Sequence, residues 1–265
     1  GGLMLDADAD NANDGGDGMF IAEGVRLTSA AGIVLDATTG GILSDGTGCS
    51  LLARNGIAIN DDLARTPVPL AGALAFNADT DADGSGTFAI GAGATVIGLT
   101  GDILITADDM DLQGTLIGDP IYITESSGAG IGLGDTSMPG GLNIGAAELD
   151  RITAASLDLD TAGSIVIDHI TGADSGGANA VALDAGGTIS FINNPATFDS
   201  LAAAADNGIL VNQDIATATG DLSLDGDAND APDGSDGIQF AADVAVSSAG
   251  SLTLESATGG MAASG

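Results

Sequence analysis

The sequence contains no lysine and no tryptophan, and aromatic residues make up only 3% of its 265 residues. Four arginines (Arg26, Arg54, Arg65 and Arg151) stand against 38 acidic residues, which gives a formal net charge of −34. A surface of this charge repels the phosphates of nucleic acid and of anionic lipid, so a function based on a basic binding patch is excluded. With so few aromatic rings, any core has to be built from Val, Ile, Leu and Ala, which predicts a thin core.

Cysteine and long apolar runs are also scarce. Cys49 is the one cysteine, which excludes a disulfide within this chain and leaves either a small buried hydrophobe or an intermolecular thiol. The apolar runs are all shorter than the roughly 18 residues needed to span a bilayer, so no membrane insertion is expected in this segment. The G-G-x-G-x-D nonapeptide of calcium β-rolls does not repeat either, which disfavours that fold.

Acidic residues are what the chain has in excess. Like charges at this density repel one another unless salt or bound cations screen them. We therefore expect the folded chain to work in an ionic medium that supplies cations, such as the exterior of a cell.

A long repeat organises the chain. Residues 1–46 align without a gap on residues 220–265, and about 20 of the 46 pairs are identical at a constant offset of 219 residues. Self-similarity at a fixed period is typical of arrays and solenoids. We expect residues 1–219 to be one full repeat, and 220–265 to be the start of the next repeat of a longer, continuous array.

Apolar residues recur at alternate positions in short clusters. The clusters are Leu3/Leu5, Val25/Leu27, Ile33/Leu35, Ile57/Ile59, Leu74/Phe76, Phe88/Ile90, Ile103/Ile105, Ile121/Ile123, Leu142/Ile144, Leu157/Leu159, Ile165/Ile167, Ile189/Phe191, Ile209/Val211, Leu222/Leu224, Val244/Val246 and Leu252/Leu254. This period of two predicts many short strands separated by Gly, Asp, Asn, Ser and Thr turns. Helical spacing is limited to residues 146–155 and 198–206, which we interpret as solenoid corners because isolated helices of this length are marginal.

Short strands of this kind fit either a β-sandwich or a parallel β-helix. A β-sandwich of this size requires larger inward-facing side chains and more dipeptides such as Asn-Gly that form hairpin turns. Small apolar residues instead fit the narrow interior of a stack of parallel coils. The sequence therefore predicts an all-β, right-handed parallel β-helix with protruding acidic loops. At about 20 residues per coil and roughly 4.8 Å per coil, one repeat would hold about 11 coils and span near 50 Å.

Two segments, residues 140–171 and 205–230, resemble the low-complexity repeats of filamentous-haemagglutinin-like exoproteins and giant bacterial surface adhesins. The resemblance implies a right-handed parallel β-helix, exported to the bacterial cell surface, that serves as an adhesin, a fibre or a scaffold. It implies no particular activity, and it names no receptor.

Three acidic inserts are candidate cation sites. Asp79, Asp81 and Asp83 precede Gly84 and reproduce the first half of a D-x-D-x-D-G calcium loop, in which alternate carboxylates converge on a hard cation. The terminal copies offer Asp6 and Asp8, and Asp225 and Asp227, but lack the glycine. Position twelve of such a loop is Ile90 instead of Glu, so these are not complete EF-hands. The alternative is a solvated loop that keeps the chain soluble.

The sequence gives little evidence of a catalytic site. His169 follows Asp168 and could form a carboxylate-oriented base, but it is the one histidine and has no nucleophile in sequence context, so a corner or surface role is expected.

The sequence thus predicts a non-catalytic repeat unit of an extracellular bacterial fibre or long surface adhesin, which binds copies of itself end to end or continues as an array. The sequence does not identify a host molecule or surface ligand to which this unit would bind. The alternative function is a β-helical protein that binds or degrades carbohydrate, since hydrolysis needs only a carboxylate pair.

Overall fold

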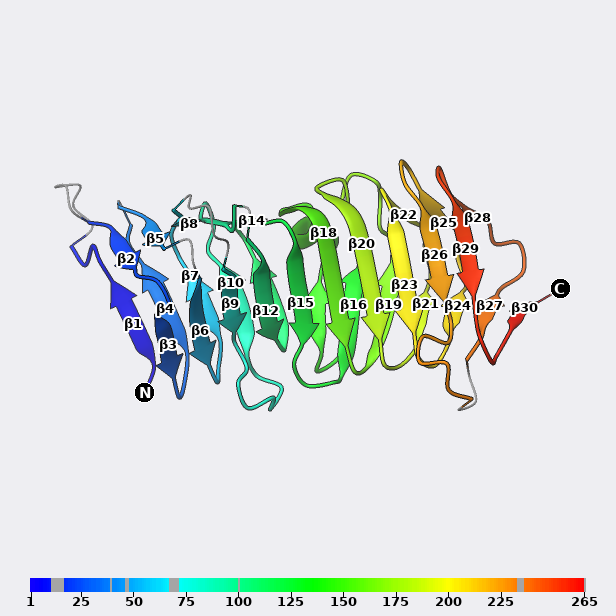
Figure 1. The fold of residues 1–265 in the computed structure, drawn as a ribbon, viewed down its shortest axis with the longest axis horizontal. Coiled ribbons are helices and arrows are strands. Elements are labelled where there is room, and N and C mark those ends of the chain that lie inside the picture. Colours follow the sequence, from blue (N-terminus) through cyan, green and yellow to red (C-terminus); the bar gives the residue numbers. More distant parts are fainter. Residues whose placement is uncertain are drawn as a thin grey trace. The chain divides into compact units, whose positions relative to one another are not determined.

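The computed structural model describes residues 1–10, 17–38, 40–45, 48–66, 72–99, 101–232 and 236–264. The described chain is all-β apart from one short helix, and its strand pairings are parallel (Figure 1). It divides into two compact units, residues 1–127 with 151–155, and residues 128–150 with 156–265. No helix in the described ranges is long and apolar enough to cross a membrane.

In the first unit the chain visits three runs of paired strands in turn and returns to the first. The first run is a 5-stranded sheet of order β1-β4-β7-β10-β13. The other two, β2-β5-β8-β11-β14 and β3-β6-β9-β12-β15, belong to one 15-stranded sheet, in which β18 (Ile152–Thr161) lies between β14 and β15. Their bounds are β1 Leu3–Asp6, β2 Met19–Ile21, β3 Arg26–Ser29, β4 Ile33–Asp36, β5 Ile42–Ser44, β6 Cys49–Ala53, β7 Ile57–Ile59, β8 Leu63–Arg65, β9 Leu74–Asn77, β10 Thr87–Ile90, β11 Thr95–Ile97, β12 Ile103–Ala107, β13 Asp109–Leu112, β14 Thr115–Ile117 and β15 Ile121–Glu125.

The second unit follows the same cycle through runs of neighbours β17-β16-β19-β21-β24-β27-β30, β22-β25-β28 and β20-β23-β26-β29. Its elements are β16 Gly130–Gly134, β17 Leu142–Ile144, α1 Ala146–Leu149, β19 Ser164–Asp168, β20 Ala178–Ala185, β21 Ile189–Phe191, β22 Ala196–Phe198, β23 Leu201–Ala205, β24 Ile209–Val211, β25 Ile215–Thr217, β26 Leu222–Asp225, β27 Ile238–Phe240, β28 Val246–Ser247, β29 Leu252–Glu255 and β30 Met261–Ala263. The remaining strand, β18 Ile152–Thr161, begins in the first unit and ends in the second.

This cyclic parallel pairing is consistent with the predicted parallel β-helix, whose handedness stays a prediction. Strand formation follows from the alternating apolar residues. Their side chains point inward and those between them point outward, as in β4, where Ile33 and Leu35 are buried and Val34 and Asp36 are half-buried. Because parallel pairing places like residues on neighbouring coils, the core consists of stacked Ile and Leu with four fully buried phenylalanines, Phe76, Phe88, Phe191 and Phe198.

Coil length differs from the prediction. Four coils separate Leu3 from Met110 in the first unit, and four separate Ile165 from Met261 in the second. The mean coil is therefore about 25 residues long instead of about 20, because turns are enlarged by inserts while strand spacing stays fixed by hydrogen bonding. Single coils vary widely: Ile103 pairs with Ile121, whereas Ile57 pairs with Phe88.

The repeat is visible in the strand register. In the first unit Leu3 pairs with Ile33 and Met19 pairs with Ile42. In the second unit Leu222 pairs with Leu252 and Ile238 pairs with Met261. Each second-unit pair is the first-unit pair advanced by 219 residues. The two copies therefore fold alike, element by element, from β1–β5 to β26–β30.

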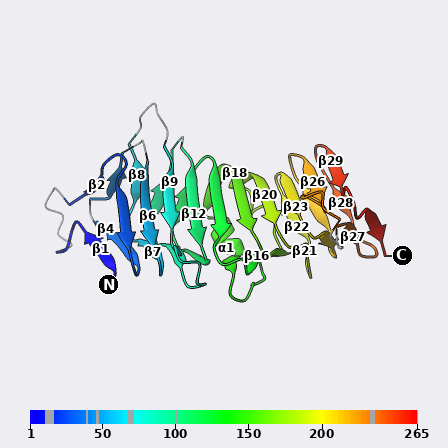
Figure 2. The ribbon, with the colours of Figure 1, turned by 60° about the horizontal axis from the view of Figure 1, so that its bottom comes forward.

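The two segments with helical spacing of apolar residues, 146–155 and 198–206, form mostly β-strand in the structure. Within residues 146–155 the helix α1 covers only Ala146–Leu149, next to β16 (Figure 2), and the chain is extended again from Ile152. Within residues 198–206, Leu201–Ala205 forms β23 rather than a corner. Stacking on β20 and β26 decides this, because Leu201 and Ala203 pair with Val181 and Leu183 on one side and with Leu222 and Leu224 on the other.

Candidate cation site

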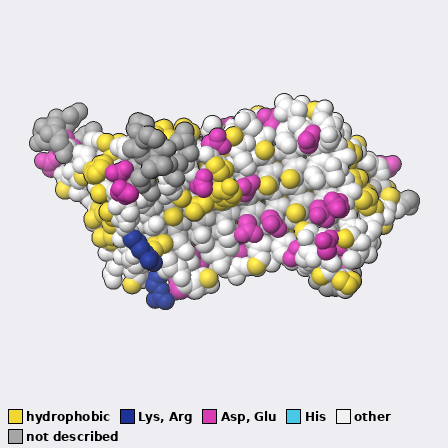
Figure 3. All heavy atoms as spheres, viewed as in Figure 1, with side chains coloured by type: hydrophobic (Ala, Val, Ile, Leu, Met, Phe, Trp, Pro, Cys, Tyr) yellow, Lys and Arg dark blue, Asp and Glu magenta, His cyan; other side chains and the backbone are white. Residues whose placement is uncertain are grey.

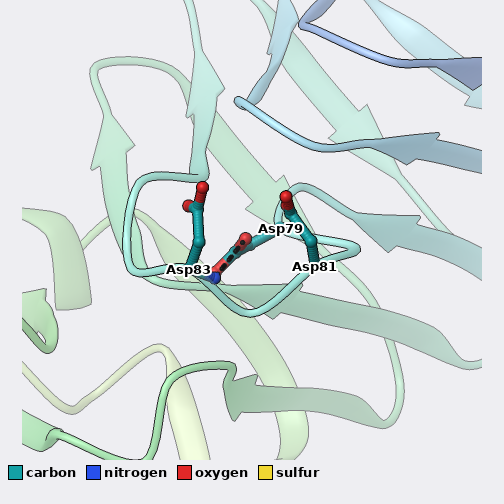
Figure 4. Close-up of side chains that lie close together, drawn as sticks. All are labelled: Asp79, Asp81 and Asp83. Carbon is teal, nitrogen blue, oxygen red and sulfur yellow. Dashed lines mark hydrogen bonds between the residues drawn. The ribbon is translucent and has the colours of Figure 1, made fainter.

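Three carboxylates gather in the loop between β9 and β10. One ligand oxygen each from Asp79, Asp81 and Asp83 lies within 4.8 Å of the others, and the Asp79 carboxylate lies between the other two (Figure 4). Asp79 is buried, while Asp81 and Asp83 are exposed. This group of three is the one found among the described residues that could hold a metal ion.

Asp79 organises the loop around itself. Its backbone N–H donates to Asn77 Oδ1 at 3.1 Å, which turns the chain at the end of β9. Its own carboxylate accepts the N–H groups of Asp83 and Gly84 at 3.3 and 3.4 Å. Gly84 has φ +80°, a conformation that side chains disfavour, which explains the glycine at this position.

Positive charge is sparse around this loop. Arg54, which follows β6, forms an ion pair with Asp81 at 2.8 Å, and its side chain is 51% exposed. On the face shown in Figure 3, acidic side chains are widely spread, and the few basic side chains gather in one place. An exposed pair of this kind contributes little to stability.

Sequence reasoning missed the acids that lie beneath the loop. Asp108, which follows β12, and Glu125, which ends β15, are 7% and 4% exposed. The pKa of Asp108 is raised, first by burial and then by the charges of Asp79, Glu125 and Asp109, while a hydrogen bond with Ser127 opposes the shift. Ser126 Oγ donates to Asp79 Oδ2 at 2.7 Å. The available signal was the shared Ala-Asp that follows both strands, Ala78-Asp79 and Ala107-Asp108.

The other predicted ligands form smaller arrangements. Asp6 and Asp225 are turn acceptors, each binding the N–H of the aspartate two residues later at 3.0 Å. Asp8 and Asp227 are themselves buried, at 3% and 1% exposed. Asp227 Oδ2 accepts the N–H of Thr258 at 2.6 Å, whereas Asp227 Oδ1 has no hydrogen-bond partner. No third carboxylate joins either pair within the described ranges, and their metal binding stays a prediction.

His169 is an exposed surface residue. Its Nδ1 lies 2.6 Å from Asp135 Oδ2 rather than on the neighbouring Asp168. Asp168 is buried and accepts from the side chains of Asn193 and Asn194 at 2.8 and 3.0 Å. The pKa of His169 is raised, mainly by the hydrogen bond and the charge of Asp135. The Asp168–His169 dyad considered from the sequence is therefore not formed.

Cys49 is buried in β6, as predicted for a small hydrophobe. Burial raises the pKa of its thiol to about 11, although the charge of Arg65 and a hydrogen bond with Ser44 act in the other direction. The thiolate is therefore scarce at neutral pH.

Two shallow surface pockets lie beside the corresponding Gly-Gly turns of the repeat, Gly40-Gly41 and Gly259-Gly260. One, of about 340 Å³, lies beside Gly259, Gly260 and Asp236, and the other, of about 490 Å³, lies beside Gly40, Gly41 and Asp62. Neither lining includes an aromatic side chain. Comparison of the chain with protein-family models, with curated proteins and with solved structures gives no match.

Proposed function

We propose that this chain is a structural repeat unit, a right-handed parallel β-helix, in the shaft of an extracellular bacterial fibre or long surface adhesin. Its role is to supply length and an acidic surface, and it carries out no catalysis. It associates with further copies of itself, as a continuing array or end to end.

One observation carries the proposal, namely the repeat whose strand register is kept. Two stretches 219 residues apart form five corresponding strands, and two strand pairs, β1–β4 with β26–β29 and β2–β5 with β27–β30, keep the same register. A catalytic site is needed once, whereas a duplicated set of coils adds length and repeats a surface. The charge of −34 also fits a medium rich in cations.

We further propose Ca²⁺ as the cation of the Asp79–Asp81–Asp83 loop. Ca²⁺ binds carboxylate oxygens at about 2.3–2.6 Å in flexible geometry, so oxygens on opposite sides of one ion lie roughly 5 Å apart. The 4.8 Å limit on the separation of the three oxygens is compatible with that span. A loop without the bidentate Glu still offers carboxylates and backbone carbonyls.

Incubation with a panel of acidic and neutral oligosaccharides tests the absence of catalysis. The proposal expects neither turnover nor saturable binding at one fixed position, because neither pocket offers an aromatic platform for a sugar ring. Saturable turnover, or a sugar bound at a single site, would support the carbohydrate-active alternative and overturn the shaft.

Removal of the cation tests the calcium assignment. At low ionic strength, Ca²⁺ at a hundredfold excess over Kd should stabilise the fold by about 2.7 kcal/mol, because it binds the folded form alone. We expect a chelator to lower the Tm measured by circular dichroism, and Na⁺ at matched ionic strength not to restore it. An unchanged Tm would show that the loop binds no cation and is a solvated surface loop.

A further inference from the structure

The loop between β9 and β10 has a positively charged neighbour on the preceding coil. Thr80 N donates to Ala53 O at 2.9 Å, which fastens the loop to the end of β6. Arg54 and Asp81 each come one residue later, and Arg54 Nη2 lies 2.8 Å from Asp81 Oδ2. The ion pair therefore follows from the stacking of β9 on β6, which the strand register fixes.

Arg54 is held at its charged end by Asp81 alone. Within the described part of the chain, its guanidinium makes this one polar contact, and its side chain is 51% exposed. Exposed ion pairs contribute little to stability, so the long arginine side chain can exchange Asp81 for solvent at small cost.

The same carboxylate is required by the loop cation proposed above. Ca²⁺ binds carboxylate oxygens at about 2.3–2.6 Å. An ion that shared Asp81 Oδ2 with Arg54 would lie no more than about 5.4 Å from the guanidinium nitrogen. Positive charges at that separation repel each other. Bound Ca²⁺ and the Arg54–Asp81 ion pair therefore oppose each other.

We propose that Arg54 is a built-in counter-ion of the loop, which competes with Ca²⁺ for Asp81. Without the metal, the guanidinium neutralises part of the loop charge. When Ca²⁺ binds, the guanidinium moves into solvent, so Arg54 lowers the affinity of the site and sets the Ca²⁺ concentration at which the site fills. The inference rests on the proposed binding of Ca²⁺ by Asp79, Asp81 and Asp83, and it adds regulation of that site from the preceding coil.

A purely structural role of Arg54 predicts a change of the opposite sign. If the ion pair served only to fix the loop, its removal would leave Asp81 less ordered and would weaken Ca²⁺ binding. Competition instead predicts that removal of the guanidinium tightens Ca²⁺ binding. The direction of the change in affinity separates the two roles.

The test is calorimetric titration of the full chain with Ca²⁺ at about 0.1 M ionic strength, where exposed charges more than about 10 Å apart are largely screened. Arg54→Gln should bind Ca²⁺ roughly three- to tenfold more tightly than the unchanged chain, because both the repulsion and the competing ion pair are removed. Arg54→Lys keeps the positive charge and should bind within about twofold of the unchanged chain.

The matched control is Arg26→Gln, which removes the same charge from the same unit. Arg26 is exposed and begins β3, whereas the loop follows the end of β9. We expect Arg26→Gln to bind Ca²⁺ within about twofold of the unchanged chain, since its charge is screened from the loop.

Thermal unfolding gives a second signature. Without metal, Arg54→Gln should melt slightly below the unchanged chain, because the ion pair is lost. At one Ca²⁺ concentration well above Kd the order should reverse, because stabilisation by a ligand grows with its affinity. Arg26→Gln should differ from the unchanged chain by the same amount with and without Ca²⁺.

The outcomes separate the two proposals. Ca²⁺ binding that Arg54→Gln leaves unchanged or weakens overturns the competition and keeps the loop site. Equal tightening by Arg54→Gln and Arg26→Gln also overturns the competition, since net charge alone would then explain the effect. If neither the unchanged chain nor Arg54→Gln binds Ca²⁺, the loop site itself is wrong, and the competition with it.

Discussion

At the residue scale, several aspartates have a structural role in the turns that follow strands. Asp6, Asp36, Asn77 and Asp225 each follow the last inward residue of a strand and accept a backbone N–H two residues later. A short side chain with an oxygen at its end fits this turn, whereas a longer one does not. Part of the negative charge is thus required by chain reversal, and an acidic cluster in the sequence is weak evidence of a ligand.

The single histidine gives a residue-scale prediction. Because the Asp135 carboxylate stabilises the imidazolium of His169, we expect Asp135→Asn to lower the pKa of His169 toward its ordinary value of 6.5. Asp174→Asn should lower it less, since its charge is a smaller cause. NMR titration of the one histidine measures both.

The raised pKa of His169 determines how its contribution to folding stability depends on pH. The folded state holds the proton more tightly than the unfolded state, so the contribution to stability is complete below the ordinary pKa and is lost as pH rises through the raised one. A His169 pKa that is identical in both variants and in the unchanged chain would contradict the assigned ion pair.

At the element scale, local pattern determined most strands. Sixteen predicted apolar pairs were named by residue above, and twelve of them are buried with strand geometry, namely those from Ile33/Leu35 to Leu222/Leu224, Leu157/Leu159 included. The other four are not buried: Leu3/Leu5, Val25/Leu27 and Val244/Val246 are half-buried, and in Leu252/Leu254 the first residue is 47% exposed. These four pairs lie in or beside β1, β3, β28 and β29, each of which ends a run of paired strands, a property of neighbours that the local sequence does not contain.

Some elements could not be predicted because tertiary contacts override their local preference. The strand β16 reads Gly-Ile-Gly-Leu-Gly, and all five residues are buried. A Cβ on Gly130 would lie 2.3 Å from Ser164 O, and one on Gly132 would lie 2.8 Å from Asn143 Oδ1. Glycine is thus required by the close approach of β19 and β17, although its propensity disfavours strands.

Packing between strands of different sheets gives the element-scale prediction. Phe76 of β9 and Phe88 of β10 contact each other with ring centroids 5.0 Å apart, and both are fully buried. Phe76→Ala should therefore lower the free energy of unfolding by about 3–5 kcal/mol, through lost burial and a residual cavity. Urea unfolding followed by circular dichroism measures the change.

The matched control is Phe20→Ala, since Phe20 is 60% exposed on β2 of the same unit. We expect it to change the free energy of unfolding by no more than about 0.5 kcal/mol. Equal losses from both substitutions would show that Phe76 is not part of a packed core.

At the scale of the whole molecule, coil length limits what the sequence reveals. The loop carboxylates of Asp79, Asp81 and Asp83 are close in sequence, and their grouping could be predicted from their spacing. Asp108 comes from another coil, and its neighbours depend on the number of residues per turn. Coil length varies too much for this: Ile103 pairs with Ile121 in a short coil, whereas Ile57 pairs with Phe88 in a long one. The residue that stacks on a given residue therefore cannot be found by counting a fixed number of positions along the sequence.

The proposed shaft requires that the chain be one continuous β-helix in which the repeat sets a fixed advance along the axis. At about 25 residues per coil, 219 residues make somewhat fewer than nine coils, and this number is not whole, because β1 lies in the 5-stranded sheet and its counterpart β26 in the 15-stranded sheet. At roughly 4.8 Å per coil the advance is about 40 Å. This value replaces the estimate near 50 Å that shorter coils would give.

Double electron–electron resonance between nitroxides on Met4→Cys and Ser223→Cys, in a Cys49→Ala background, measures that advance directly. The two sites are equivalent positions of the repeat, on β1 and β26. The account predicts a single distance distribution centred at about 40 Å or slightly more, because somewhat fewer than nine coils separate the labels along the axis and their strands, β1 and β26, belong to different sheets. A distribution centred below about 30 Å would contradict a continuous β-helix, and with it the proposed shaft.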